Sequence, residues 1–447
     1  MTRIGTSGLG RRTLLQGAAA GLGTSLLQGL PRLASAQNGR VSFTAWSAAV
    51  DQVQAHMTAF RETTGIDVNY ENFPWAQYRA AVVTRLVGGA DMDVLWVSDA
   101  WLPEFAEAGW LSPIDDIPQL MQYNDEMAPY CLESMVYDGQ QYGLPYYGDH
   151  MSFMYNTRIL EEAGIAAPPT TWDEVIEQSK IIQEKGLADY PLLLSLAADT
   201  WLVEFISALA FSHGGRFIGD DGSPVMADPD GGAVAAARFV RDAIHEHGIV
   251  SPGAVETPEI NGLRAMGEGL HAFGIVPTYR IRALNDPSQA PQAGNIRIAM
   301  MPMGGNADAP YTCGWIRFYG LTPTARADAG RLEAATQFIE FFGGRDVTGE
   351  YTMQKMLLLD LGLPFCCTPL HDDPEVQAFW DEWAGTSEVI DQQAALALKK
   401  DVISPWFSEW NEVNNRVWQG VFLDQLTAEA ALGQAADEWV ALETAYR

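Results

Sequence analysis

Aromatic side chains at the predicted ends of strands and in loops are the residues of this sequence best suited to hold a small ligand. A tryptophan or tyrosine ring presents a flat apolar surface with few rotamers to restrict, which suits the C–H faces of a sugar-like ring. Each ring also has an ordinary alternative role in core packing. The candidates are Trp46, Trp101, Tyr146, Tyr147, Trp201, Tyr279 and Trp315.

Four charged side chains near these aromatic residues could hydrogen-bond hydroxyl groups. Asp99 follows a predicted strand and could accept hydrogen bonds from a ligand or cap the next helix. Asp149 could bind a ligand or stabilise a hinge. Arg280 and Arg317 stand out because the chain has 27 Lys and Arg against 57 Asp and Glu. Each arginine could bind a carboxylate or sulfonate ligand, but we expect it to pair with one of the chain's own acids.

Motifs for catalysis do not accompany these residues. The sequence has no nucleophile elbow, no phosphate-binding loop and no His-Glu-x-x-His pattern. A glycosidase, the main enzymatic alternative, would need two carboxylates at a defined separation, and 57 acids supply such pairs by chance. We therefore expect a binding protein rather than an enzyme, with no cofactor and no metal.

The first 36 residues are predicted to be an export signal of the twin-arginine type. Arg11-Arg12 precedes an apolar, glycine- and alanine-rich run over 14–30, and Ala34-Ser35-Ala36 offers a small-x-small cleavage site. The run is too short and too rich in glycine for a membrane span. No cysteine stands at the cleavage point to carry a lipid. We expect a periplasmic protein cut after Ala36; a chance arginine pair in a disordered start is the alternative.

The net charge limits the partners of the chain. The whole sequence carries −30, and its first 36 residues hold four arginines and no acid, so the cleaved chain would carry −34. Such a charge argues against nucleic acids and anionic membrane surfaces as partners. We expect a monomer. A saline habitat and simple solubility are equally good explanations of the acidity.

The four cysteines are Cys131, Cys313, Cys366 and Cys367. An oxidising compartment permits a disulfide, and we expect Cys313 to pair with Cys366 or Cys367. A metal site is the weaker alternative, because adjacent cysteines lack the two-residue gap that zinc ligands prefer and no histidines cluster near them.

Strands and helices alternate after the predicted signal. Residues 41–46, 66–70 and 93–97 are predicted strands, and 50–63 and 75–87 are predicted helices. This order is typical of a parallel sheet covered by helices, in which ligands lie beyond the carboxyl ends of the strands. The rule would bring Trp46 and Asp99 to one site.

The remaining chain is mainly helical and has no low-complexity linker, which favours two lobes that exchange strands over two tethered domains. Thr171 and Glu174 form a capping-box pattern at the start of one helix. Helices are predicted over 159–163, 172–185, 200–212, 231–247, 327–342 and after 405, and strands over 270–276, 296–303 and 311–321.

Several of these segments, in this order, resemble family 1 extracellular solute-binding proteins, the carbohydrate-type receptors of ABC importers. The most specific block runs from Tyr155-Asn156 through Pro168-Pro169 to Thr171-Trp172-Asp173-Glu174. The other matching segments are Asp93–Val97 with the following 103–115, Gly143–Tyr147, Met266–Phe273 running to Tyr279, and Cys313-Gly314-Trp315.

The resemblance implies an α/β, two-lobe periplasmic-binding-protein fold, type II-like, with a ligand cleft between the lobes. The lobes would comprise 37–147 with 305–345, and 148–304 with 346–447. It implies a small carbohydrate ligand, hinge closure and delivery to the membrane permease of an ABC transporter. A polyol, a glycerol-phosphate compound or a sulfonated sugar is the alternative ligand. Trp46 and Asp99 would act from one lobe, and Trp201 and Tyr279 from the other.

Overall fold

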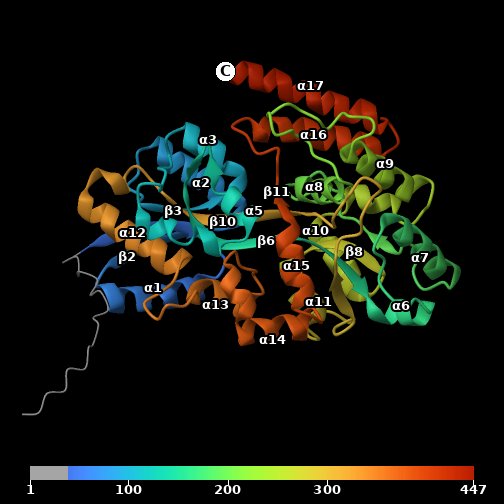
Figure 1. Cartoon of the computed structure of the whole chain (residues 1–447), viewed down its shortest axis with the longest axis horizontal. Helices are drawn as coiled ribbons and strands as arrows, with labels where there is room; N and C mark the ends of the chain where they lie inside the picture. The colour runs from blue at the N-terminus through green and yellow to red at the C-terminus, as the bar shows by residue number, and fades with distance from the viewer. Residues whose placement is uncertain (1–38) are drawn as a thin grey trace, which may run out of the picture. The chain divides into compact units, whose positions relative to one another are not determined.

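The computed structural model of the protein describes residues 39–447, which belong to one compact unit (Figure 1). The predicted export signal and its cleavage site lie outside the described residues. No helix of the described part is long and apolar enough to cross a membrane.

A nine-stranded sheet forms the frame of the fold. Its strands follow the order β2-β1-β3-β10-β6-β8-β7, with β11 paired to β10 and β9 paired to β6. The neighbours β1, β2 and β3 are parallel, whereas β10 runs antiparallel to β3 and β6. The bounds are β1 Arg40–Trp46, β2 Asp67–Phe73, β3 Val94–Ser98, β6 Gly143–Asn156, β7 Leu192–Leu193, β8 Phe273–Pro277, β9 Ile296–Ala299, β10 Thr312–Leu321 and β11 Ala397–Lys399; β4 Val136–Tyr137 and β5 Gln140–Gln141 form a separate hairpin.

Two long strands connect the two halves of this sheet. The first half of β6 pairs with β10, and its second half, from Met151 onward, pairs with β8 and β9. In the same way β10 pairs with β11 at its start and with β3 at its end. Figure 1 shows β6 and β10 running between the helices around β1–β3 and those around β8. Each strand therefore belongs to two cores.

The buried apolar residues form two clusters, here called the first core and the second core. The first core surrounds β1–β3, and the second surrounds β7 and β8. Helices of the first core are α1 Val50–Thr64, α2 Trp75–Val87, α3 Leu102–Glu107, α4 Pro118–Met121, α5 Pro129–Glu133, α10 Glu259–Glu268, α11 Ile281–Asn285, α12 Ala329–Gly343, α13 Thr352–Leu361, α14 Pro374–Trp383 and α15 Glu388–Leu396; those of the second are α6 Thr157–Ala163, α7 Trp172–Glu184, α8 Leu202–Ser212, α9 Gly232–His245, α16 Phe407–Phe422 and α17 Ala428–Tyr446.

The two cores agree with the expected two-lobe α/β fold. The exact lobe boundaries stay a prediction, because segments of both predicted lobes pack in the other core: α10 and α11 of 148–304 lie in the first core, and Cys313 and Trp315 of 305–345 lie in the second. Buried residues from Tyr351 to Ala397 belong to the first core, although the sequence placed 346–447 with the second lobe. The packing of α13 and α14 explains the difference, because α13 contacts α1, α12 and β6, and α14 packs against α13.

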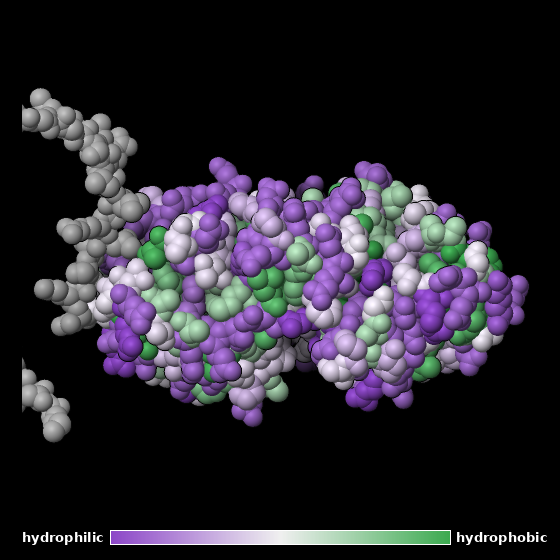
Figure 2. Space-filling model, turned by 90° about the horizontal axis from the view of Figure 1, so that it is seen from below, coloured by the Kyte–Doolittle hydropathy of each residue, from purple (hydrophilic) through white to green (hydrophobic). Residues whose placement is uncertain are grey.

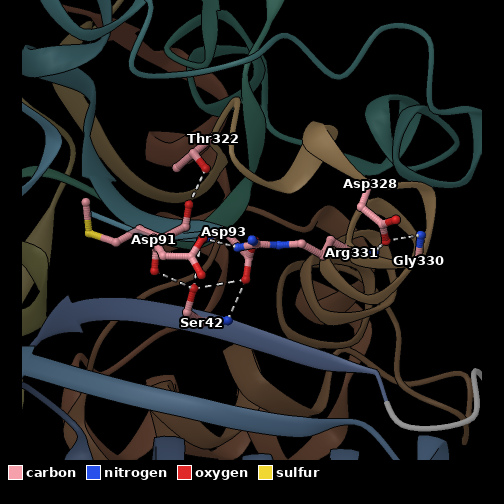
Figure 3. Close-up of polar contacts among 8 residues, drawn as sticks. Ser42, Asp91, Asp93, Thr322, Asp328, Gly330 and Arg331 are labelled. Carbon is pink, nitrogen blue, oxygen red and sulfur yellow. Dashed lines mark hydrogen bonds and ion pairs between the residues drawn. The ribbon is translucent and has the colours of Figure 1, made fainter. Parts of the chain in front are cut away.

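A polar network anchors α12 to the amino end of β3 (Figure 3). The Asp93 carboxylate accepts hydrogen bonds from the Ser42 N–H (2.8 Å) and hydroxyl (2.9 Å) and from the Arg331 guanidinium (2.6 and 3.0 Å). Asp328 caps α12 by accepting from the Gly330 and Arg331 N–H groups. These bonds fix the helix to β1 and β3 within the first core.

The predicted cysteine pairing is wrong. All four cysteines are buried free thiols. Cys313 on β10 lies in the second core, whereas Cys366 and Cys367 lie in the first core, so Cys313 has no cysteine partner. Spacing along the chain gave no information on which core each thiol would join.

The surface of the described residues carries no large apolar area on the face seen in Figure 2. Hydrophilic residues dominate that face, and hydrophobic ones form small separate groups. The exposed large hydrophobic side chains come from many different elements. This distribution fits the high net charge of the chain.

Candidate functional site

Four tryptophans form an aromatic cluster in the first core, at the end of the sheet where β1 and β3 finish. They are Trp46, Trp75, Trp96 and Trp101, here called the first aromatic cluster. Trp46 ends β1, and its ring centre lies 5.6 Å from that of Trp96. The ring of Trp75 stacks on that of Trp101, with 5.7 Å between the ring centres. Trp96 is buried, while Trp46 and Trp101 keep partial exposure.

Arg317 on β10 connects this aromatic cluster to Asp99. Its guanidinium lies 5.7 Å from the Trp75 ring centre and 5.8 Å from that of Trp96, within cation–π range. The same group donates to Asp99 Oδ1 at 2.9 Å. Asp99 opens the short 3-10 helix η1 (Asp99–Trp101) directly after β3. The expected pairing of Arg317 with an acid of the chain is confirmed.

Two further residues complete a buried charge cluster, defined here as Asp99, Glu204, Arg317 and Lys400. Lys400 follows β11, which lies beside β10, and its Nζ donates to Asp99 Oδ2 at 2.9 Å and to Glu204 Oε1 at 3.3 Å. The Lys400 side chain has 0% exposure. Glu204 belongs to α8 of the second core, so the cluster joins the two cores.

Sequence reasoning missed Lys400 and Glu204. The ion pairs span large distances along the chain, and nothing local marks the partners. One signal was available for Lys400, since Lys399-Lys400 is a basic pair in a chain with few basic residues.

The charge cluster sets the protonation of its members. Burial alone would raise the pKa of the Asp99 carboxyl, but Lys400 and Arg317 together hold it below its ordinary value. Burial raises the pKa of Glu204, with Lys400 opposing the shift, and the second carboxylate oxygen of Glu204 has no hydrogen-bond partner. The neighbouring cations therefore favour the ionised form of Asp99, and Glu204 leaves one buried oxygen without a partner.

A second aromatic group lies where α8 begins. Trp201 precedes α8, and its ring lies roughly parallel to that of Tyr279 at 6.4 Å and edge-on to that of Trp315 at 5.6 Å. Trp201 and Tyr279 are partly exposed, whereas Trp315 on β10 is fully buried and its indole N–H has no partner. This second aromatic group is Trp201, Tyr279 and Trp315.

Asp149 and Arg280 adjoin the second aromatic group. Asp149 on β6 sits opposite Trp315 in the sheet and accepts from the Tyr279 N–H at 3.3 Å. Its complete burial raises the pKa of this carboxyl to about 8. Arg280 makes two 2.8 Å bonds to the carboxylate of Glu259 and lies over the Tyr279 ring. The expected pairing of Arg280 with an acid is also confirmed.

The structure separates the two neighbouring tyrosines of β6 from the partly exposed rings. Tyr146 is buried among Trp96 and Tyr319 of the first core, and burial raises its pKa. Tyr147 is buried as well, with the positive charge of Arg317 near its phenol. Both rings contribute to the wall behind the candidate site rather than to its open surface.

Among the cavities of the described part of the molecule, one lies beside the buried charge cluster and another lies away from it. One of about 240 Å³ borders the buried charge cluster, lined by Asp99, Lys400 and Asp401 together with residues of α3, α5 and β4. A larger one, of about 530 Å³, lies at the far edge of the second core around β7 and His271. Within the described residues, no group of three or more His, Cys, Asp or Glu side chains could hold a metal ion.

The two-lobe α/β fold is that of MalE-like periplasmic binding proteins. The family model for bacterial extracellular solute-binding proteins matches residues 41–348. Because this match covers more than half of the chain, the protein belongs to that family.

Known proteins with similar sequences or structures are also binding proteins. A Brucella abortus (strain 2308) protein named only as a binding protein is 24% identical, over 84% of this chain and 85% of its own length. The maltotriose-binding protein of Pyrococcus abyssi is 26% identical over 70% of this chain and 62% of its own. The maltose-bound MalE3 of T. maritima has a TM-score of 0.73 at 23% identity, covering 90% of this chain and 99% of that structure.

Proposed function

We propose that this protein is the periplasmic substrate-binding component of an ABC importer that captures a small carbohydrate between its lobes and delivers it to a membrane permease. The observation that carries the proposal is the pair of partly exposed, roughly parallel rings of Trp201 and Tyr279, with the buried acceptor Asp149 behind them. Such rings suit the C–H faces of a sugar, and flanking polar groups can bind its hydroxyls. The maltotriose-binding relative supports this ligand class.

The surroundings of the two arginines favour a neutral ligand over a sulfonated or phosphorylated one. Arg280 is bound by Glu259 through two hydrogen bonds, and Arg317 is bound by Asp99. An anionic ligand would have to displace a carboxylate that is already buried and paired, which costs more than binding a neutral hydroxyl. We therefore place the neutral mono- or oligosaccharides first.

Transport would use hinge closure around β6 and β10, the strands shared by both cores. A ligand favours closure only if it binds the closed form better, and so it must contact groups from both lobes. We assign Trp46 and Trp101 to one side and Trp201 and Tyr279 to the other. The proposal includes no catalytic step.

A thermal-shift screen tests the proposal. The full chain is heated with neutral mono- and oligosaccharides, polyols, sulfonated sugars and phosphodiesters, each at millimolar concentration. A ligand present at a hundredfold excess over its Kd adds about 2.7 kcal/mol to the stability of the folded state. We expect Tm to rise for one neutral sugar series, with the sugar recovered unchanged. A rise confined to anionic compounds, or none at all, would contradict the assignment.

A further inference from the structure

Two thiols that are far apart in the sequence meet beneath the crossover strand β6. Cys131 lies on α5 and Cys366 lies just before the 3-10 helix η6 (Thr368–Asp372). Gly148 of β6 stands between them. A Cβ atom on Gly148 would lie 2.7 Å from the Cys131 sulfur and 2.5 Å from the Cys366 sulfur, so both sulfurs reach the same small space.

The backbones of the two cysteines are held side by side by hydrogen bonds. The Ala128 N–H donates to the Cys366 carbonyl at 2.9 Å, and the Cys131 N–H donates to the Ala128 carbonyl at 3.0 Å. Met127 and Cys367 form an antiparallel bridge next to them. The segments therefore keep the same alignment whether or not the sulfurs are joined.

The other two cysteines have different surroundings. The Cys367 sulfur accepts a hydrogen bond from the Gln354 amide at 3.0 Å, and the Cys313 thiol faces the carbonyl of Gly314 in the second core. Among the four thiols, Cys131 and Cys366 are the pair that shares one space. Both thiols are buried in the first core, where solvent and substrates do not reach them. Burial argues against a role for either one as a reactive free thiol.

We propose that Cys131 and Cys366 form a disulfide when the chain folds under oxidising conditions. A small or protein disulfide supplies the oxidising equivalents. The thiolate of one cysteine attacks a sulfur of that disulfide and releases one thiolate, and the second cysteine then attacks the mixed disulfide and releases the other. Two thiols of the chain lose two protons and two electrons, and the oxidant is reduced to two thiols.

The position of this bond determines its effect. Both cysteines belong to the first core, and the bond would tie α5 to the segment before η6 directly under Gly148. It closes a very long loop of the unfolded chain and so restricts that state. We expect the aromatic rings of the candidate site to keep their neighbours. The bond should raise thermal stability and leave the binding groups in place.

Burial also determines when the bond can form. Cys131 is 0% exposed and Cys366 is 1% exposed, and burial raises the pKa of the Cys366 thiol. Oxidants therefore reach the pair during folding or through local opening. Chain that folds fully reduced should react with oxidised glutathione only over hours, whereas chain that folds in its presence should emerge cross-linked.

Peptide mapping tests the proposal. The full chain is unfolded in urea, refolded in a buffer of reduced and oxidised glutathione, alkylated and digested with trypsin. Cys131 falls in peptide 86–158, Cys313 in 298–317, and Cys366 with Cys367 in 356–399. We expect 86–158 joined to 356–399 and free Cys313. Four alkylated cysteines, or a link to 298–317, would overturn the proposal.

The neighbouring cysteines provide a matched control. C367A should keep the cross-link, whereas C366A should lose it; the reverse result would assign the bond to Cys367 and overturn the proposal. Alanine suits these apolar positions, and if a variant folds poorly, fragment sequencing of the linked wild-type peptides assigns the bond to Cys366 or to Cys367. Oxidised wild type should melt several degrees above the reduced protein, and C131A should show no such difference. Equal melting of cross-linked and reduced wild type would contradict the stabilising role.

Discussion

A buried carboxylate lies at each end of β3, and the two carboxylates connect different parts of the molecule. At the amino end, Asp93 binds Ser42 of β1 and Arg331 of α12, and this network joins elements of the first core only (Figure 3). At the carboxyl end, Asp99 binds Arg317 and Lys400, and Lys400 continues to Glu204 of the second core. Similar ion pairs thus anchor a helix within one core and join one core to the other.

Solvent exposure separates the two sites further. The Arg331 side chain is 30% exposed, so water solvates it when its partner is lost. The Lys400 side chain is 0% exposed, and its two carboxylate partners are almost as deeply buried. Breaking a fully buried pair leaves an uncompensated charge, which makes the loss far larger than for a half-exposed pair. The comparison predicts a graded series of effects.

The largest effect is expected for K400M. Methionine fills a similar volume but leaves Asp99 and Glu204 without their shared cation. The free energy of unfolding should fall by roughly 3–5 kcal/mol, the usual range for breaking a buried pair. Urea unfolding at pH 7 measures it. The double variant K400M/E204Q should recover part of the loss because one buried charge disappears. A loss below about 1 kcal/mol would mean that Lys400 is hydrated in the native protein.

Asp401, the next residue along the chain, is a buried carboxylate that makes no direct ion pair within the described residues, although the charge of Arg216 acts to lower its pKa. It accepts from the Phe217 and Ile218 N–H groups, and burial raises its pKa to about 6. The unfolded carboxyl has a pKa near 3.9. Between these values the unfolded chain loses its proton first, so the contribution of Asp401 to stability falls as pH rises and is constant above about pH 6.

D401N removes that dependence. As pH rises from 4 to 7, the free energy of unfolding of D401N, measured relative to that of wild type, should increase by about 2–3 kcal/mol. Parallel urea titrations of both proteins measure the difference, and the buried histidines cancel because they titrate in both. A constant difference across this range would show that Asp401 is ionised throughout.

A smaller effect is expected for R331M at the other end of β3. Asp93 keeps its bonds from Ser42, and water replaces part of the lost guanidinium, so the free energy of unfolding should fall by about 1–3 kcal/mol. Ligand affinity should not change, because this network joins only β1, β3 and α12, all elements around the first core. If R331M changed ligand affinity as much as it changes stability, the network at Asp93 would also influence the binding site, and the proposed difference between the two ends of β3 would be wrong.

Local patterns predicted the elements better than the site. The helix predicted over 75–87 is α2, the strand predicted over 41–46 is β1 with one more residue, and Thr171 caps α7 as expected. Periodicity and caps act within a few residues. Glu174 departs from the pattern in one detail, since its carboxylate binds Thr170 rather than Thr171.

Contacts between distant segments could not be predicted in this way. The strand rule correctly placed Trp46 and Asp99 at the same end of the sheet. Lys400 reaches Asp99 only because β11 pairs with β10, and that pairing has no sequence signal. The cysteine prediction failed for the same reason. Which of the predicted residues bind ligand stays a prediction.

The last comparison is between the proposed ligand-binding ring of Trp201 and the buried charge cluster, whose member Glu204 lies three residues further along the chain. W201A removes a partly exposed ring that lies beside Tyr279 but leaves Glu204 and Lys400 paired. Affinity for the sugar found by the thermal screen should fall about ten- to hundredfold, roughly 1.4–2.8 kcal/mol. Titration calorimetry measures it, with Y446A on α17 as the control for losing an exposed ring. Unchanged affinity in both W201A and Y279A would remove these rings from the site, and equal weakening in Y446A would point to a general loss of folded protein.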